Sequence, residues 1–165
     1  MQHRPRRSWR LAGYDYTCAG TYFITVCLQR RAPIFGRISD GEIQPTPAGQ
    51  MVAHWWREVA CAFPSVALGT YVVMPDHLHA IITLGAGVPA DNANPPSLSK
   101  IMQWFKTMTT NIYIRGVRQE GWPTFERLWE RSYYDHIIRN DAAHRRIRRY
   151  IKHNAAQWWQ RYGDY

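Results

Sequence analysis

The sequence predicts an α+β fold in a single domain, and three observations lead to this prediction. Two segments with the composition of β-strands, residues 21–29 and 71–84, are interleaved with segments that carry the apolar stripe of amphipathic helices. A chain of 165 residues has the usual size of one domain and can bury a sizeable core. No internal repeat and no second domain boundary interrupts residues 1–165, so we expect one domain throughout.

The expected strands begin at residues 21–29, TYFITVCLQ, which are rich in β-branched and aromatic side chains. Residues 34–43 predict a short hairpin around Asp40-Gly41, a dipeptide that favours tight turns. Residues 71–84 predict two strands separated by a Met-Pro-Asp break. A further strand is expected within residues 128–138.

Three amphipathic helices are expected between and after these strands. The first has Thr46 as its N-cap and Pro47 as its first residue, runs to about residue 62 and ends before a proline. The second spans residues 97–115, and the third begins at Asn140 or Asp141 and continues to about residue 159. The apolar faces expected for the first two helices consist of Met51, Trp55, Val59 and Ala62, and of Leu98, Ile101, Phe105, Met108 and Ile112.

Three segments are expected to lack regular structure. Residues 1–19 form a basic N-terminal arm and loop. Residues 85–96 are rich in Gly, Pro, Asn and Asp, which predicts a flexible loop. Residues 116–127 are expected to be irregular.

The charge of the chain indicates a polyanionic partner. The formal net charge is +9 and the isoelectric point is about 9.8, which favours nucleic acid first and an anionic membrane surface second. No apolar run reaches the roughly 18 residues that a membrane span requires, and no apolar signal core follows the basic start. Three widely spaced cysteines form neither a disulfide framework nor a zinc knuckle, which fits a location in the reducing cytoplasm.

The strongest candidate for a functional site lies in the second strand of residues 71–84. His77 and His79 are two residues apart, so they project from the same face of a strand, with Leu78, Ala80 and Ile82 on the other face. Two imidazoles side by side on a rigid strand make half of a metal site. The alternative is a pair of polar residues on a solvated strand face.

The third helix supplies residues that can complete such a site. Tyr150 and Asn154 are spaced i and i+4 and share one helix face. A phenolic oxygen can act as a nucleophile, and an amide oxygen suits a hard cation such as Mg²⁺ or Mn²⁺. Taken by itself, the helix is also compatible with Tyr150 at the edge of the core and Asn154 as a cap.

Basic and aromatic residues fit a nucleic-acid partner. Arginines crowd the N-terminal arm and the third helix, where Arg145 and Arg149 form one i, i+4 pair and Arg148 and Lys152 another. Each of these residues is also compatible with a solvated helix face. The arm contributes Arg4, Arg6 and Arg7, and the tryptophans that could stack on unpaired bases are Trp104, Trp122, Trp129 and Trp158, most of them expected in the core.

Three motifs in order along the chain resemble the REP-associated tyrosine transposases, relatives of the single-tyrosine HUH transposases of bacterial insertion sequences. They are MPDHLH, RLWERSYYDHIIRND and RRYIKHN, supported by LAGYDYTCAGTYFITVCLQRR and FKTMTTNIYIRG, so the resemblance covers nearly the whole chain. The resemblance implies a compact fold of the ferredoxin or RRM type with a central antiparallel sheet. It also implies Mg²⁺ or Mn²⁺, a single-stranded DNA substrate with a REP-like hairpin, and cleavage through a 5′-phosphotyrosine.

The resemblance also implies roles for single residues. His77 and His79 match the metal-binding pair, Tyr150 matches the nucleophile, and Asn154 matches a third metal ligand. The family commonly has proline after that asparagine, whereas Ala155 stands here and should let the helix continue. The remaining expected DNA contacts lie in the matching motifs or on the third helix: Lys106, Arg131, His136, Arg139, Arg145, Arg149 and Lys152.

Rival assignments follow from residue type. Tyr133 and Tyr134 are alternative nucleophiles, and Asp76 is an alternative third ligand that we expect to point away from the histidine face. Two other functions stay open, a non-catalytic nucleic-acid-binding module and a zinc-dependent hydrolase. The sequence leaves open whether the protein is a monomer or a homodimer.

Overall fold

A four-stranded antiparallel sheet forms the centre of the protein, in a computed structural model that describes residues 19–87 and 96–163. Its strands lie in the order β4-β5-β1-β6. The bounds are Val66–Met74 for β4, His77–Leu84 for β5, Gly20–Cys27 for β1 and Tyr134–Ile138 for β6. The predicted α+β class with a central antiparallel sheet is confirmed.

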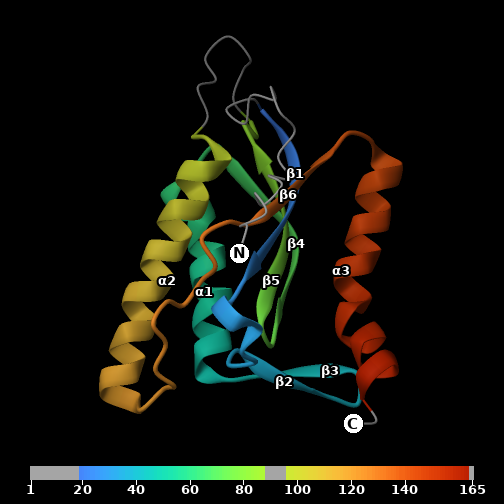
Figure 1. Cartoon of the computed structure of the whole chain (residues 1–165). Helices are drawn as coiled ribbons and strands as arrows, with labels where there is room; N and C mark the ends of the chain where they lie inside the picture. The colour runs from blue at the N-terminus through green and yellow to red at the C-terminus, as the bar shows by residue number, and fades with distance from the viewer. Residues whose placement is uncertain (1–18, 88–95, 164–165) are drawn as a thin grey trace, which may run out of the picture.

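Helices cover both faces of this sheet (Figure 1). Helices α1 (Pro47–Ala62) and α2 (Leu98–Glu120) lie on one face, and α3 (Asp141–Tyr162) lies on the other. The main core, on the side of α1 and α2, includes Tyr22, Ile24, Trp56, Leu78 and Phe105, all fully buried. A smaller core of Ile81, Ile138 and Ile151 lies under α3. Each residue of β5 therefore faces one of two distinct environments.

The register of the sheet fixes what surrounds the two histidines. His79 on β5 pairs with Thr25 on β1 and with Val72 on β4, and Thr25 in turn pairs with Tyr134 on β6. Directly paired residues point to the same face of a sheet, so these four side chains form one row on the α3 face. Leu78, on the opposite face, is fully buried, as the alternation predicts.

Local signals place the helix starts and the small hairpin as the sequence predicts. Thr46 accepts a hydrogen bond from the Gly49 amide, and Asn140 accepts one from the Ala143 amide, so both are N-caps. Strands β2 (Gly36–Ser39) and β3 (Glu42–Pro45) pair around Asp40 and Gly41, whose φ angles of 53° and 77° are left-handed. The tip of this hairpin lies against Ala156 of α3.

Several boundaries differ from the predictions. Strand β4 begins at Val66 instead of residue 71, and α2 continues to Glu120, so residues 116–120 are helical instead of irregular. Helix α3 continues to Tyr162, which agrees with the expectation that Ala155 does not interrupt it. The helix ends are set by Gly121 in a left-handed C-cap for α2 and by Gly163 for α3.

The buried faces of α1 and α2 match the predicted stripes only in part. Val59, Leu98, Ile101 and Phe105 are buried as predicted. Val52 and Trp56 are buried in place of Met51 and Trp55, and Ala62 is exposed. Thr109 and Tyr113 are buried in place of Met108 and Ile112. The burial of a threonine follows from its hydrogen bonds, because its hydroxyl donates to the Phe105 carbonyl and accepts from the Trp129 indole.

Two predicted segments fall outside the part of the chain that the structure describes. They are most of the basic arm, at residues 1–18, and most of the loop, at residues 88–95. Between residues 19–87 and 96–163, no helix has the length and apolarity needed to cross a membrane.

Candidate active site

His77 and His79 lie side by side at the start of β5, on the face that α3 covers. Their ring centroids are 4.4 Å apart and their Nε2 atoms are 3.0 Å apart. Bonds from histidine nitrogen to a first-row metal are about 2.0–2.1 Å long, so two nitrogens at this separation can bind one ion. The predicted common orientation of the two side chains is therefore found, in a geometry that fits a shared cation.

Outer partners orient both imidazoles through their Nδ1 atoms. Nδ1 of His77 lies 2.5 Å from a carboxylate oxygen of Asp76, and Nδ1 of His79 lies 2.8 Å from the hydroxyl of Thr25. A carboxylate only accepts hydrogen bonds, so Nδ1 of His77 is the donor and its Nε2 is left to accept or to coordinate. His79 can adopt the same tautomer by donating to Thr25.

Asp76 is held in turn by Arg31. An Nη1 atom of Arg31 lies 3.3 Å from the second carboxylate oxygen of Asp76. Burial opposes ionisation of Asp76, but the hydrogen bond with His77 and the Arg31 charge outweigh it and lower the pKa of the carboxyl. Asp76 points toward His77 because it belongs to the turn before β5, where strand alternation does not apply. The prediction that Asp76 faces away from the histidine pair is therefore wrong.

His79 is held in its neutral form by its surroundings. Burial first, and then repulsion from the positive charges of His77 and Arg31, lower the pKa of His79 to about 3. A neutral imidazole is the form that binds metals, so no proton has to be displaced from His79 at neutral pH. The same low pKa makes His79 a poor acceptor for a full proton.

Tyr150 reaches the histidine pair from α3. Its hydroxyl lies 3.2 Å from Nε2 of His79, and its ring meets Phe23 edge-on with centroids 6.1 Å apart. The side chain is nevertheless 41% exposed. The phenol is therefore positioned by contacts on one side and open to a substrate on the other, and the whole arrangement comes from one chain.

Asn154 lies one helical turn beyond Tyr150, on the side of α3 that turns toward the sheet. It is only 8% exposed, and its neighbour Ile151 belongs to the core beneath α3. Among the residues that the structure describes, its side-chain amide has no hydrogen-bond partner, and no three His, Cys, Asp or Glu side chains converge on one point. A third ligand beside the histidines would therefore have to be of another type, and an amide oxygen suits a hard cation.

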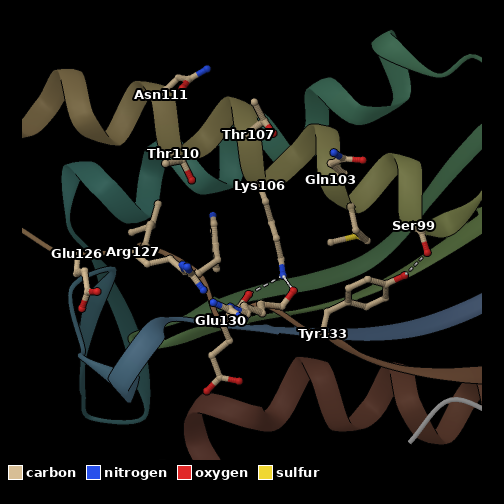
Figure 2. Close-up of a pocket in the computed structure, with 14 residues that line it drawn as sticks. Ser99, Gln103, Lys106, Thr107, Thr110, Asn111, Glu126, Arg127, Glu130 and Tyr133 are labelled. Carbon is tan, nitrogen blue, oxygen red and sulfur yellow. Dashed lines mark hydrogen bonds between the residues drawn. The ribbon is translucent and has the colours of Figure 1, made fainter. Parts of the chain in front are cut away.

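The two rival tyrosines point to opposite faces of the sheet. Tyr133 lies on the α2 side, with its hydroxyl 3.4 Å from the Ser99 hydroxyl and its ring 5.7 Å from the ammonium of Lys106 (Figure 2). Tyr134 lies on the α3 side, in the same row as Thr25 and His79. Of the two, only Tyr134 shares the face of the histidine pair.

Lys106, one of the predicted DNA contacts, is engaged inside the protein. Its ammonium donates to the carbonyls of Glu130, Arg131 and Ser132 at 2.8, 3.3 and 3.1 Å. Figure 2 shows the Lys106 side chain extending from α2 toward Glu130. Burial lowers the pKa of this ammonium to about 8. Lys106 thus joins α2 to the segment before β6. Together with Arg131 it also lines a groove of about 680 Å³.

The other predicted DNA contacts differ in their placement. Those that the structure describes are exposed, while the arginines of the N-terminal arm, Arg4, Arg6 and Arg7, lie outside the described residues. The exposed set consists of Arg131, His136, Arg139, Arg145, Arg149 and Lys152. Of the four candidate stacking tryptophans, Trp129 is buried, Trp104 and Trp122 are half-buried, and Trp158 is exposed.

Known proteins are similar to this chain in sequence and in fold. The family described as "Transposase IS200 like" matches residues 21–154. A protein of Haemophilus influenzae described as uncharacterized is 32% identical over 164 residues, covering 94% of this chain and 91% of that protein. The solved structure of a REP-associated tyrosine transposase bound to a REP hairpin has a TM-score of 0.63 at 24% identity, covering 90% of this chain and 74% of that chain. This last similarity shows a common fold.

Proposed function

Because this chain belongs to the family of IS200-like transposases, we propose that it cleaves and rejoins single-stranded DNA through a covalent bond to Tyr150. The observation that supports this most directly is the Tyr150 hydroxyl, 3.2 Å from Nε2 of His79 and open to solvent on its other side. A nucleophile and a candidate metal-binding pair at this distance suit an attack on a bound phosphate.

In the proposed reaction, the phenolic oxygen of Tyr150 attacks a phosphorus of the DNA backbone. An oxygen–phosphorus bond forms as the bond from phosphorus to the 3′-oxygen breaks, so a 3′-hydroxyl leaves and the 5′ end stays on the protein. The proton lost by the phenol balances the proton gained by the leaving oxygen. A second 3′-hydroxyl can then attack the phosphotyrosyl ester, which releases Tyr150 and joins two DNA ends.

His77, His79 and Asn154 are the residues that would hold a divalent ion, Mg²⁺ or Mn²⁺. A bound ion would polarise the scissile phosphate and offset the charge that develops on it. The 3.0 Å separation of the two Nε2 atoms and the neutral state of His79 support this assignment. The carboxylate of Asp76 and the hydroxyl of Thr25 keep both rings in position.

His79 also positions the nucleophile. Its neutral Nε2 can accept a hydrogen bond from the Tyr150 hydroxyl, which fixes the phenolic oxygen beside the proposed metal site. Since the pKa of His79 is about 3, the imidazole orients the phenol but does not take its proton at neutral pH. The proton must pass to the substrate or to solvent on the exposed side of the ring.

We propose a hairpin of the REP-type palindromes as the DNA that this protein recognises. The protein with the similar fold was solved bound to a REP hairpin, and the net charge of +9 suits any folded or single-stranded DNA. Tyr150 and His79 approach each other within one chain, which supports a site that a single protomer completes.

Incubation with end-labelled hairpin DNA and Mn²⁺ distinguishes this function from the alternatives. A covalent protein–DNA adduct that survives denaturation supports strand transfer through tyrosine. Free 5′-phosphate ends without an adduct would identify a metal-dependent hydrolase, and retention of intact DNA would identify a binding module. Either of these two results would refute the proposed function.

A further inference from the structure

Tyr134 is placed beside the candidate active site by the register of the sheet. It pairs with Thr25 on β1, and Thr25 pairs with His79 on β5. Adjacent strands lie about 4.8 Å apart, so the backbones of Tyr134 and His79 are separated by about 10 Å. Thr25, between them, makes the hydrogen bond that orients His79.

The ring of Tyr134 is exposed in a position where a large aromatic side chain gains little from packing. It is 46% exposed, although it lies in a strand of the central sheet. Among the described residues, its side chain has no hydrogen bond and no ring contact, unlike that of Tyr133. The protein therefore presents a tyrosine ring to solvent on the same sheet face as the site, two strands from His79.

The surroundings of Tyr134 favour a negatively charged strand with planar groups. His136, two residues further along β6, is exposed on the same face, and Arg139 is exposed just beyond the end of the strand. The whole chain carries a net charge of +9. Exposed aromatic rings on a sheet face, flanked by basic residues, stack on the unpaired bases of single-stranded nucleic acids.

We propose that Tyr134 is a stacking site for an unpaired base of the substrate strand, close to the phosphate that Tyr150 attacks. This inference rests on the proposed function, because it places the scissile phosphate at the histidine pair. A separation of about 10 Å is short enough for the stacked base to belong to a nucleotide within one or two positions of that phosphate. Tyr134 is then a binding residue, and its hydroxyl takes no part in the chemistry.

The proposal can be tested by binding alone, with DNA that the protein cannot cleave. All variants carry Tyr150→Phe, which removes the nucleophilic oxygen and keeps the ring. The probe is a fluorescent hairpin DNA with single-stranded flanks, in which one flank nucleotide at a time is replaced by an abasic one. Affinity is measured for the parent, for Tyr134→Phe, which keeps the ring, and for Tyr134→Leu, which keeps apolar bulk without it.

We expect one flank position at which the abasic replacement weakens binding about tenfold in the parent and in Tyr134→Phe. The same replacement should cost Tyr134→Leu less than about twofold, because the stacking partner is already absent. Tyr162→Leu is a matched control, since Tyr162 is 47% exposed and lies near the end of α3. It should respond to the abasic series as the parent does. Thermal unfolding of each variant shows that the fold is kept.

Two results would overturn the stacking site. One is an abasic series that affects the parent and Tyr134→Leu equally. The other is loss of the base dependence in Tyr162→Leu as well. If the wild-type protein forms the covalent adduct while either result is found, the stacking site is wrong and the proposed function stands. Failure of every DNA to bind would refute both.

Discussion

Three tyrosines carry a phenol that could act as the nucleophile, and their environments differ. Tyr150 lies against His79, Tyr134 is on the same sheet face but two strands away, and Tyr133 faces α2. We expect Tyr150→Phe to abolish the covalent adduct with hairpin DNA while leaving affinity nearly unchanged, because only the attacking oxygen is lost. Tyr133→Phe and Tyr134→Phe should still form the adduct, which denaturing electrophoresis measures.

Peptide mapping of the trapped adduct identifies the attached residue directly. Trypsin should release the nucleophile in the short peptide Tyr150-Ile151-Lys152, since an arginine precedes it and a lysine ends it. A nucleotide attached instead to the peptide that contains Tyr133 and Tyr134 would contradict the assignment.

For single residues, the sequence predicts correctly which side chains lie together when they are close along the chain. The period of a strand predicts that His77 and His79 point the same way, and the period of a helix predicts that Tyr150 and Asn154 share a face. Arg31 and Thr25 could not be found in this way. They reach the site through a turn and a strand pairing that join residues more than 40 positions apart.

Arg31 shows how little local signal such a residue can carry. Its φ angle of 52° is left-handed, an uncommon conformation for a residue other than glycine, and the preceding Arg30 has a φ of 61°. The sequence around Arg31 contains no signal that predicts this left-handed backbone conformation. Only the tertiary contact with Asp76 gives the side chain a place in the site.

At the level of elements, Lys106 links α2 to the segment that leads into β6. Its ammonium donates to three backbone carbonyls there, so Lys106→Met leaves those carbonyls without their donor. We expect this change to lower the free energy of unfolding by about 1–3 kcal/mol, measured by urea denaturation. Lys100→Met, at an exposed position of the same helix, should change it by less than about 0.5 kcal/mol. Equal effects of the two changes would contradict the structural role of Lys106.

The same residue gives a pH dependence with a definite sign. Burial lowers the pKa of Lys106 from 10.5 to about 8 in the folded protein. Between these pH values the unfolded chain binds more protons than the folded one, so the contribution of Lys106 to the free energy of unfolding rises with pH. The difference between wild type and Lys106→Met should therefore grow in favour of wild type from pH 8 to pH 10.5. A difference that shrinks over this range would be evidence against the shift.

Helix α3 carries two exposed arginines one turn apart, Arg145 and Arg149, on an element that also carries the nucleophile. If both contact phosphates, Arg145→Ala with Arg149→Ala should reduce the slope of log affinity against log salt by about 2. The matched pair Arg115→Ala with Arg118→Ala removes two exposed arginines from α2 and should leave the slope unchanged. Fluorescence anisotropy with labelled hairpin DNA at several salt concentrations measures both. If the Arg145→Ala, Arg149→Ala variant keeps the slope of the wild type, these two arginines belong to a solvated helix face and do not contact DNA.

Element boundaries show where sequence patterns are reliable. Caps such as Thr46 and Asn140 depend on a single side chain and one amide, and both are confirmed. The predicted apolar stripes of α1 and α2 are confirmed at Val59, Leu98, Ile101 and Phe105 and wrong at their other positions, because burial depends on partners from other elements. Thr109 is buried against Trp129, a residue 20 positions away, and hydropathy alone cannot reveal that contact.

At the level of the whole molecule, motifs spread over nearly the whole chain predicted both its fold and its family, and these predictions are confirmed. The proposed metal ligands come from distant parts of this fold, with His77 and His79 on β5 and Asn154 on α3. A ligand that binds only when these elements are packed together stabilises the folded state by mass action. The metal should therefore act on the stability of the entire protein.

We expect Mn²⁺ at about 100 times its dissociation constant to add about 2.7 kcal/mol to the free energy of unfolding. For a chain of this size that raises the unfolding midpoint by about 5–10 °C in scanning calorimetry, and excess EDTA should reverse the shift. The double change His77→Ala with His79→Ala should abolish it, together with the heat of Mn²⁺ binding in isothermal titration. The control change His54→Ala with His144→Ala removes one histidine from α1, which covers the opposite face of the sheet, and one from the first turn of α3. It should keep the full shift. If the shift in the unfolding midpoint persists without His77 and His79, the ion binds elsewhere, and the assignment of these histidines as metal ligands is wrong.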